Sequence, residues 1–142
     1  MEDVVFTDPG EVMEALYASI SGPPGPRDFA RLRTLFAPGA ELVRTVEGED
    51  GARVRDRMPV ETFIERAGPQ LEQTGFFEVE IARKVDVFGS IAQVWSTYEA
   101  RRDPSAEPFA RGINGVQLFF GAAGWKITSL VWDDERPGAR IP

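Results

Sequence analysis

Two glycine-rich turns in the C-terminal half constrain the fold of this chain more than any other feature. The segments 88–91 and 120–125 each join two apolar runs in which hydrophobic residues recur at every second position. A short glycine turn between two such runs is typical of an antiparallel β-hairpin. We therefore expect strands at 76–88, 91–102, 109–120 and 125–133, with residues 103–108 as a longer hairpin loop.

The N-terminal part carries the signals of helices. Asp8 is a good N-cap and Pro9 suits the first helical position, where its missing N–H costs nothing. Apolar residues then recur three and four positions apart, which predicts a helix with one buried face. That face consists of Val12, Met13, Leu16, Tyr17 and Ile20. The run of Gly and Pro at 22–26 ends this helix.

Two shorter helices follow. Asp28 is placed to cap the second, which Pro38 and Gly39 end, and Pro59 opens the third. Pro69 is expected to kink or end this third helix, because its ring blocks the preceding carbonyl, with a short turn around Leu71 after it. Between these helices we expect the remaining strands, at about 40–46 and around Val54.

No linker, repeat or low-complexity run divides residues 1–142, so we expect one domain. Helices followed by strands indicate an α+β fold in which three helices cover one face of a curved, mostly antiparallel sheet.

Composition excludes several function classes. The formal charge of −7 argues against a nucleic-acid partner, whose phosphates require a basic surface. The sequence contains no Cys and no His, which removes disulfides, zinc sites of the nitrogen–sulfur type and every His-dependent nucleophile or base. We expect no cofactor and no metal. Without a signal-peptide pattern or a long apolar run, we also expect a cytoplasmic protein that makes no contact with a membrane.

Four segments resemble the nuclear transport factor 2-like superfamily, which includes SnoaL-like proteins and ketosteroid isomerases. They are Leu35–Leu42, Ile91–Glu99, Arg111–Leu118 and Gly124–Ile127, and the resemblance covers essentially the whole chain. It implies a cone, or cystatin-like α+β roll, in which the sheet wraps the helices around an apolar pocket. It also implies a homodimer formed through the convex face of the sheet. Because this scaffold hosts many activities, it does not select one.

The ketosteroid isomerase residues transfer only in part. Tyr17 corresponds to the tyrosine that donates a hydrogen bond to the enolate in those enzymes. The position of their general base holds Arg44, and the position of their protonated carboxyl holds Val116. Arginine does not accept a proton at neutral pH and valine has none to donate, so steroid isomerisation by that mechanism is not supported.

Strand alternation provides candidate pocket residues. Pairing Phe120 with Trp125 in the last hairpin puts Asn114 opposite Val131 and turns Asp133 inward. The polar candidates for ligand binding are then Tyr17, Arg44, Tyr98, Asn114 and Asp133. Their expected apolar surroundings are Leu42, Phe63, Val94, Val116 and Val131. In the alternative interpretation, Tyr17 belongs to the core, and Arg44 and Asp133 form an ion pair.

Two functions fit these residues. The first is binding of a small hydrophobic or weakly anionic ligand in the cone pocket, with catalysis left open. The second is a non-catalytic dimerising module with a filled or vestigial pocket. In the second case a convex face carries the function, and that face consists of Trp95, Gln117, Phe119, Leu130 and Trp132. An open cavity favours the first function and a closed one the second.

Overall fold

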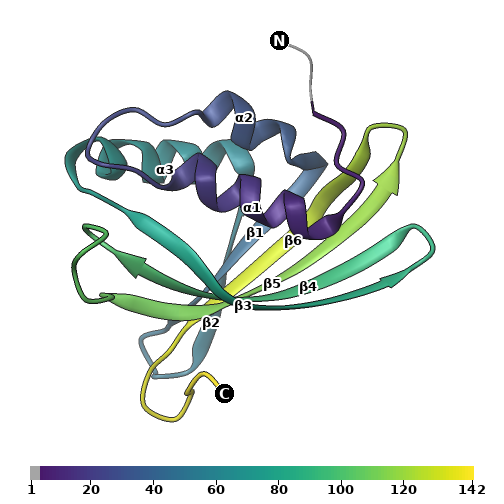
Figure 1. The fold of residues 1–142 in the computed structure, drawn as a ribbon. Coiled ribbons are helices and arrows are strands. Elements are labelled where there is room, and N and C mark those ends of the chain that lie inside the picture. The colour runs from purple at the N-terminus through teal and green to yellow at the C-terminus, as the bar shows by residue number, and fades with distance from the viewer. Residues whose placement is uncertain (1–3) are drawn as a thin grey trace.

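The computed structural model describes residues 4–142 as one curved sheet with three helices on its concave side (Figure 1). The helices are α1 (Pro9–Ile20), α2 (Phe29–Thr34) and α3 (Val60–Gln73). The strands are β1 (Phe36–Glu47), β2 (Arg53–Pro59), β3 (Phe77–Phe88), β4 (Ile91–Arg101), β5 (Ala110–Gly121) and β6 (Gly124–Asp134). The six strands lie in the order β2-β1-β6-β5-β4-β3, and only β1 and β6 pair in parallel. The predicted α+β fold is confirmed.

Helix α1 forms as its sequence predicts. The side chain of Asp8 accepts a hydrogen bond from the backbone N–H of Gly10 at 2.9 Å, which satisfies one of the free donors at the helix start. All five predicted apolar-face residues are buried. They form the central part of a core that continues onto β1, β4, β5 and β6. The helix ends at Ile20, before the Gly-Pro run.

The second helix is shorter than predicted. It ends at Thr34, and Phe36 already belongs to β1, where it pairs with Ile127 of β6. The β1–β6 register is irregular between Phe36 and Glu41, which accommodates Pro38 and Gly39 inside the strand. Here a tertiary pairing overrides the local turn signal.

Helix α3 continues through Pro69 and ends at Gln73. Pro69 therefore does not end the helix. The helix lies over β1 and β2, with Phe63 and Ile64 packed against the core. Among the described residues, 4–142, no helix is both long enough and apolar enough to cross a bilayer.

Both hairpins form where the glycine turns predict, and Phe120 pairs with Trp125 as expected. One irregularity has large consequences. Gln117 pairs with Ser129 while Leu118 pairs with Ile127, so Thr128 is an extra residue without a partner on β5. This β-bulge reverses the inward and outward alternation of β6 beyond Thr128, because side chains alternate with period two.

Candidate functional site

A cavity of about 370 Å³ lies between the concave face of the sheet and the helices. Apolar side chains from α1, α2 and α3 form one wall, and strands β1, β3, β4, β5 and β6 form the other. Six of the lining side chains are aromatic: Phe36, Phe63, Phe76, Tyr98, Phe109 and Trp132. A volume of this size with a mainly apolar lining is typical of small-molecule sites.

Two carboxyl groups face this otherwise apolar space. Glu78 projects from β3 and Asp134 from the end of β6, and both line the cavity. The sheet between them carries small residues: Ala100 and Ala110 also line the cavity, and Ala100 pairs with Glu78 on one side and with Ala110 on the other. We call the region lined by Glu78, Asp134 and Tyr98 the acidic end.

Gly112 allows Tyr98 to reach Asp134. The three residues lie in one row across the sheet, with Tyr98 opposite Gly112 and Gly112 opposite Asp134. The Tyr98 hydroxyl donates a hydrogen bond to Asp134 Oδ1 at 2.5 Å. A Cβ atom on Gly112 would lie 2.3 Å from that hydroxyl and 2.3 Å from the carbonyl oxygen of Asp133. Any larger residue at 112 would therefore displace the tyrosine.

The environment of the acidic end favours the neutral form of Glu78. Desolvation in the apolar cavity, with a smaller contribution from the negative charge of Asp134, raises the pKa of Glu78 to about 8. The Tyr98 pKa is also raised, first by desolvation and then by the hydrogen bond to Asp134. At neutral pH Glu78 thus carries a proton that it can donate or exchange.

A second polar network is buried beside the cavity. Asn114 Nδ2 donates to the Tyr17 hydroxyl at 2.9 Å, and that hydroxyl is 2.6 Å from Ser96 Oγ. Ser96 Oγ donates to Glu80 Oε2 at 2.5 Å, so the proton between Tyr17 and Ser96 must come from Tyr17. Arg83 in turn pairs with Glu80 at 2.6 Å. The network orients every member, since each donor has a defined acceptor.

The five sequence candidates occupy different places. Arg44, Tyr98 and Asn114 line the cavity, with Arg44 exposed. Tyr17 is buried in the core and does not line the cavity, and its only hydroxyl proton is used by Ser96. Of the expected apolar surroundings, Leu42 and Phe63 line the cavity, whereas Val94 and Val116 are packed in the core.

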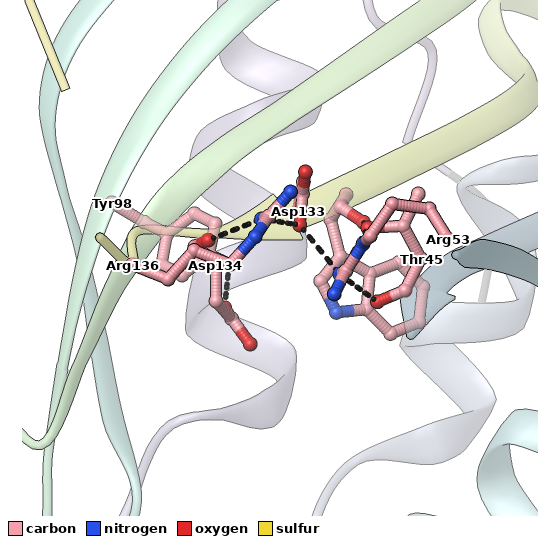
Figure 2. A network of polar contacts seen from close by, with 7 residues as sticks. Thr45, Arg53, Tyr98, Asp133, Asp134 and Arg136 are labelled. Atoms are coloured by element: carbon pink, nitrogen blue, oxygen red, sulfur yellow. Dashed lines mark hydrogen bonds and ion pairs between the residues drawn. The ribbon is translucent and has the colours of Figure 1, made fainter. Parts of the chain in front are cut away.

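The inward orientation predicted for Asp133 is wrong. Because of the bulge at Thr128, Asn114 lies opposite Trp132, and Val131 is 41% exposed. Asp133 binds Arg136 at 2.6 Å and Arg53 at 3.2 Å outside the cavity (Figure 2). Its predicted ion pair with Arg44 does not form among the described residues.

The charged surroundings of Asp133 lower the pKa of its carboxyl group, whereas the surroundings of Glu78 raise the pKa of that residue. Partial desolvation alone would raise the pKa of Asp133, but hydrogen bonds from Arg136 and Thr45 and the positive charges of Arg136 and Arg53 lower it overall. Figure 2 shows Asp133 between the two guanidinium groups, with Tyr98 and Asp134 beside them.

The same bulge corrects the predicted convex face. Leu130 is buried, and Trp132 lines the cavity, where its ring meets Phe63 edge-on at 6.3 Å. Trp95 and Phe119 are exposed on the convex face, as predicted.

Sequence reasoning missed both acidic residues of the cavity. Strict alternation, which turns Asp133 inward, leaves Asp134 on the other face because it takes no account of a bulge, and Thr128 gives no glycine or proline signal of one. Glu78 has a weak signal that could have identified it. It has the same parity as Phe76 at the start of an alternating strand, and a charged residue on an apolar face is a candidate functional group.

No family model and no curated protein matches the chain, but solved structures do. An NTF-2 like protein of unknown function from Silicibacter pomeroyi is 17% identical with a TM-score of 0.57, covering 89% of this chain and 92% of that one. A cystatin-like protein of unknown function from Nostoc punctiforme is 10% identical with a TM-score of 0.67, covering 89% and 87%. The yeast UBP3-associated protein BRE5 is 15% identical with a TM-score of 0.61, covering 89% and 92%. At these identities the comparisons establish the fold alone.

Proposed function

We propose that this chain, which has the NTF2-like, cystatin-like fold, binds a small and largely apolar ligand in the cavity between its helices and its sheet. The observation that carries the proposal is the cavity itself. The core side chains of α1 pack fully against the sheet, yet space of about 370 Å³ remains beside them. Well-packed interiors leave few voids larger than a water molecule, so an aromatic-lined space of this size supports a ligand site.

The polar groups define which ligands fit. Asn114 and Tyr98 hold their side chains in place through the hydrogen bonds to Tyr17 and Asp134, so they present fixed polar atoms to an otherwise apolar ligand. Arg44 and Arg102 are the exposed cationic side chains of the lining, and an anionic group on a ligand would have to lie beside one of them. The negative charge of Asp134 repels an anion from the acidic end, which favours the hydrophobic ligand over the weakly anionic one.

A catalytic role of the ketosteroid isomerase type has no support in this geometry. The Tyr17 hydroxyl proton is directed to Ser96 and not into the cavity, and Val116 is fully buried. The proposal therefore concerns binding.

Filling the cavity tests this function. Ala67 lies on α3 in the lining, and Ala67→Phe should occupy the space that a ligand needs. Aromatic fragments are screened against the wild-type protein by ligand-observed NMR and by fluorescence of Trp132. Ala67→Phe should abolish the binding of each fragment found, while Ala123→Phe in the exposed β5–β6 turn should leave it unchanged. Equal binding by both variants would contradict the proposal.

A second function, self-association through the convex face, is favoured by a separate observation. Trp95 is 56% exposed and lies opposite Gly115, which in turn lies opposite the exposed Val131. Two rows further along that face, beyond the Gln93–Gln117 pair, Ile91 and Phe119 pair with each other and are both exposed. Several large exposed apolar side chains on one face of a sheet are typical of association sites.

We therefore also propose a homodimer in which these sheets face each other. Trp95→Glu should convert it to a monomer in sedimentation-velocity experiments, because a charge would be desolvated in the interface. Trp132→Phe, inside the cavity, should not. A monomeric wild-type protein at micromolar concentration would rule out this second function.

A further inference from the structure

Glu78 and Asp134 differ from the other partly buried acids in what neutralises them. The side chains of Glu80, Glu99 and Glu135 are only 14%, 18% and 16% exposed, and each forms an ion pair with at least one arginine. Glu78 and Asp134 form no ion pair within residues 4–142. The Asp134 carboxyl group accepts a hydrogen bond from the neutral phenol of Tyr98. The Glu78 side chain forms no hydrogen bond within the same described residues. Because desolvated carboxylates require a counter-charge, the acidic end lacks one positive charge.

Aromatic rings flank both acids. Phe76 has the same parity on the β3 segment as Glu78, and its ring meets Phe109 at 6.0 Å in an inclined, edge-on arrangement. Trp132 likewise lies two residues before Asp134 on β6 and has the same parity, and its ring meets the Phe63 ring edge-on at 6.3 Å. All four rings line the cavity. The faces of aromatic rings attract cations, and carboxylates supply the charge, so the two features favour the same kind of ligand group.

We propose that the acidic end is a binding site for the ammonium group of a small hydrophobic amine, whose apolar part fills the rest of the cavity. This inference rests on the ligand-binding function proposed above and specifies its ligand class. The ammonium N–H groups would donate to Glu78 and Asp134, and the rings of Phe76 and Trp132 would flank the cation.

Two alternative occupants fit less well. A hard metal cation requires about six oxygen ligands, whereas the surroundings of the two carboxyl groups are small and apolar. A carboxylate ligand would add negative charge to a site that already carries an unpaired acid. The other ionisable groups that line the cavity are Tyr98, Arg44 and Arg102, with none from the helices. The guanidinium carbon of Arg102 lies 3.9 Å from the centre of the Phe109 ring, so one aromatic ring of the lining already contacts a cationic side chain.

Ammonium binding has a proton signature. The positive charge of an ammonium ion beside Glu78 favours the ionised carboxylate, so amine binding should lower the raised pKa of Glu78 and shift its proton toward solvent. Binding at pH 7 should then release up to about one proton per amine, measurable by calorimetry in buffers of different ionisation enthalpy. A neutral ligand of the same shape should release none.

The test compares 2-phenylethylamine, 2-phenylethanol and phenylacetate, which share a ring and differ in charge. For the wild-type protein at pH 7, calorimetry should give the amine at least about tenfold tighter binding than the alcohol, with phenylacetate weakest. Glu78→Gln and Asp134→Asn should each lower amine affinity by about tenfold and change alcohol affinity by less than about threefold. Asp133→Asn is the matched control, since Asp133 adjoins Asp134 but lies outside the cavity, and it should retain amine affinity.

The outcomes separate this inference from the proposed function. If the alcohol binds as tightly as the amine, or if Glu78→Gln leaves their ratio unchanged, the ammonium site is wrong while ligand binding stands. If phenylacetate binds tightest, Arg44 or Arg102 and not the acidic end selects the ligand, and the inference is again overturned. If none of the three binds to a folded wild-type protein and the fragment screen also fails, both proposals are wrong. Melting temperatures of the two variants that are no lower than that of the wild type exclude misfolding as the cause of lost affinity.

Discussion

Asp133 and Asp134 are consecutive residues of one strand, yet they end in opposite environments. Asp133 lies outside the cavity between Arg53 and Arg136, at 3.2 Å and 2.6 Å, and is 42% exposed. Asp134 lies inside, hydrogen-bonded to Tyr98 and near the protonated Glu78. One acid is neutralised by the protein, whereas the other shares its site with a second acid.

A single extra residue in β6 decides whether Asp133 or Asp134 faces the cavity. Thr128 has no partner on β5, and beyond it the inward residues of β6 become Leu130, Trp132 and Asp134. Without the bulge, Val131 and Asp133 would face the helices. Charge pairing agrees with this geometry, because arginines gather around the outer acid only.

The largest expected effect comes from disrupting the row of Tyr98, Gly112 and Asp134 across the sheet. Gly112→Ala places a Cβ atom 2.3 Å from the Tyr98 hydroxyl and 2.3 Å from a backbone oxygen. The tyrosine and the strand cannot both keep their positions, so we expect a loss of about 3 kcal/mol or more in the free energy of unfolding. Urea denaturation measures this loss.

Gly68→Ala is the control for this substitution. A Cβ atom on Gly68 of α3 meets only the Phe29 ring at 3.6 Å, an ordinary contact. Alanine favours a helix over glycine, but residue 68 precedes Pro69, whose ring disfavours the helical conformation of a residue with a Cβ atom. We therefore expect the stability of this variant to change by less than about 1 kcal/mol. A Gly112→Ala protein as stable as the wild type would show that Tyr98 does not need the space above residue 112.

The second effect concerns the network beside the cavity. Tyr17→Phe removes the hydroxyl that accepts from Asn114 and donates to Ser96. Ser96 is fully buried and Asn114 nearly so, and a buried polar group without its partner costs free energy. We expect a loss of about 2 kcal/mol in chemical denaturation. A loss below about 0.5 kcal/mol would mean that water replaces the phenol oxygen at no cost.

The third effect depends on pH. The pKa of Glu78 is raised from 4.5 to about 8, so the folded protein holds this proton more tightly than the unfolded chain. The stability that this proton contributes is therefore complete at low pH and is lost as pH rises from about 4.5 through about 8. Glu78→Gln removes the charge that must otherwise be buried. The variant should exceed the wild type by about 1–2 kcal/mol at pH 9, a value reduced because the cavity admits solvent.

Stability curves of both proteins between pH 4 and pH 9 check this expectation. The difference between them should be small near pH 4 and grow with pH. A difference that stays constant across the range would show that Glu78 titrates alike in the folded and unfolded chains.

The smallest expected effect on stability concerns Asp133, which lies outside the cavity. Asp133→Asn removes two ion pairs that are open to solvent, and such pairs contribute little. We expect a loss of about 0.5 kcal/mol, which decreases further as salt is added. A loss as large as that of Tyr17→Phe would place Asp133, and not the inner residues, at the centre of this end of the sheet.

The sequence predicts most of the fold and only part of the site. The glycine turns give both hairpins, and Asp8 with Pro9 gives the start of α1, because these signals act locally. Alternation correctly turns Tyr98 and Asn114 inward on β4 and β5, where pairing is regular.

What the sequence does not predict depends on contacts between distant strands. The bulge at Thr128 sets the orientation of Asp133 and Asp134, and the entry of Phe36 into β1 depends on its partner Ile127. In the sequence, Glu78 is one of several acidic residues on a charged strand. Its significance becomes visible only where Ala100, Ala110 and Gly112 leave it facing Asp134 without an arginine.

The most direct test of the unpaired acids is a carbon-13 NMR titration of the Glu78 carboxyl group. We expect a midpoint near pH 8 in the wild-type protein, and a lower midpoint in Asp134→Asn, where the neighbouring charge is removed. A midpoint near 4.5 in both proteins would show that Glu78 is well solvated, and the acidic end would then have no missing charge for a ligand to supply.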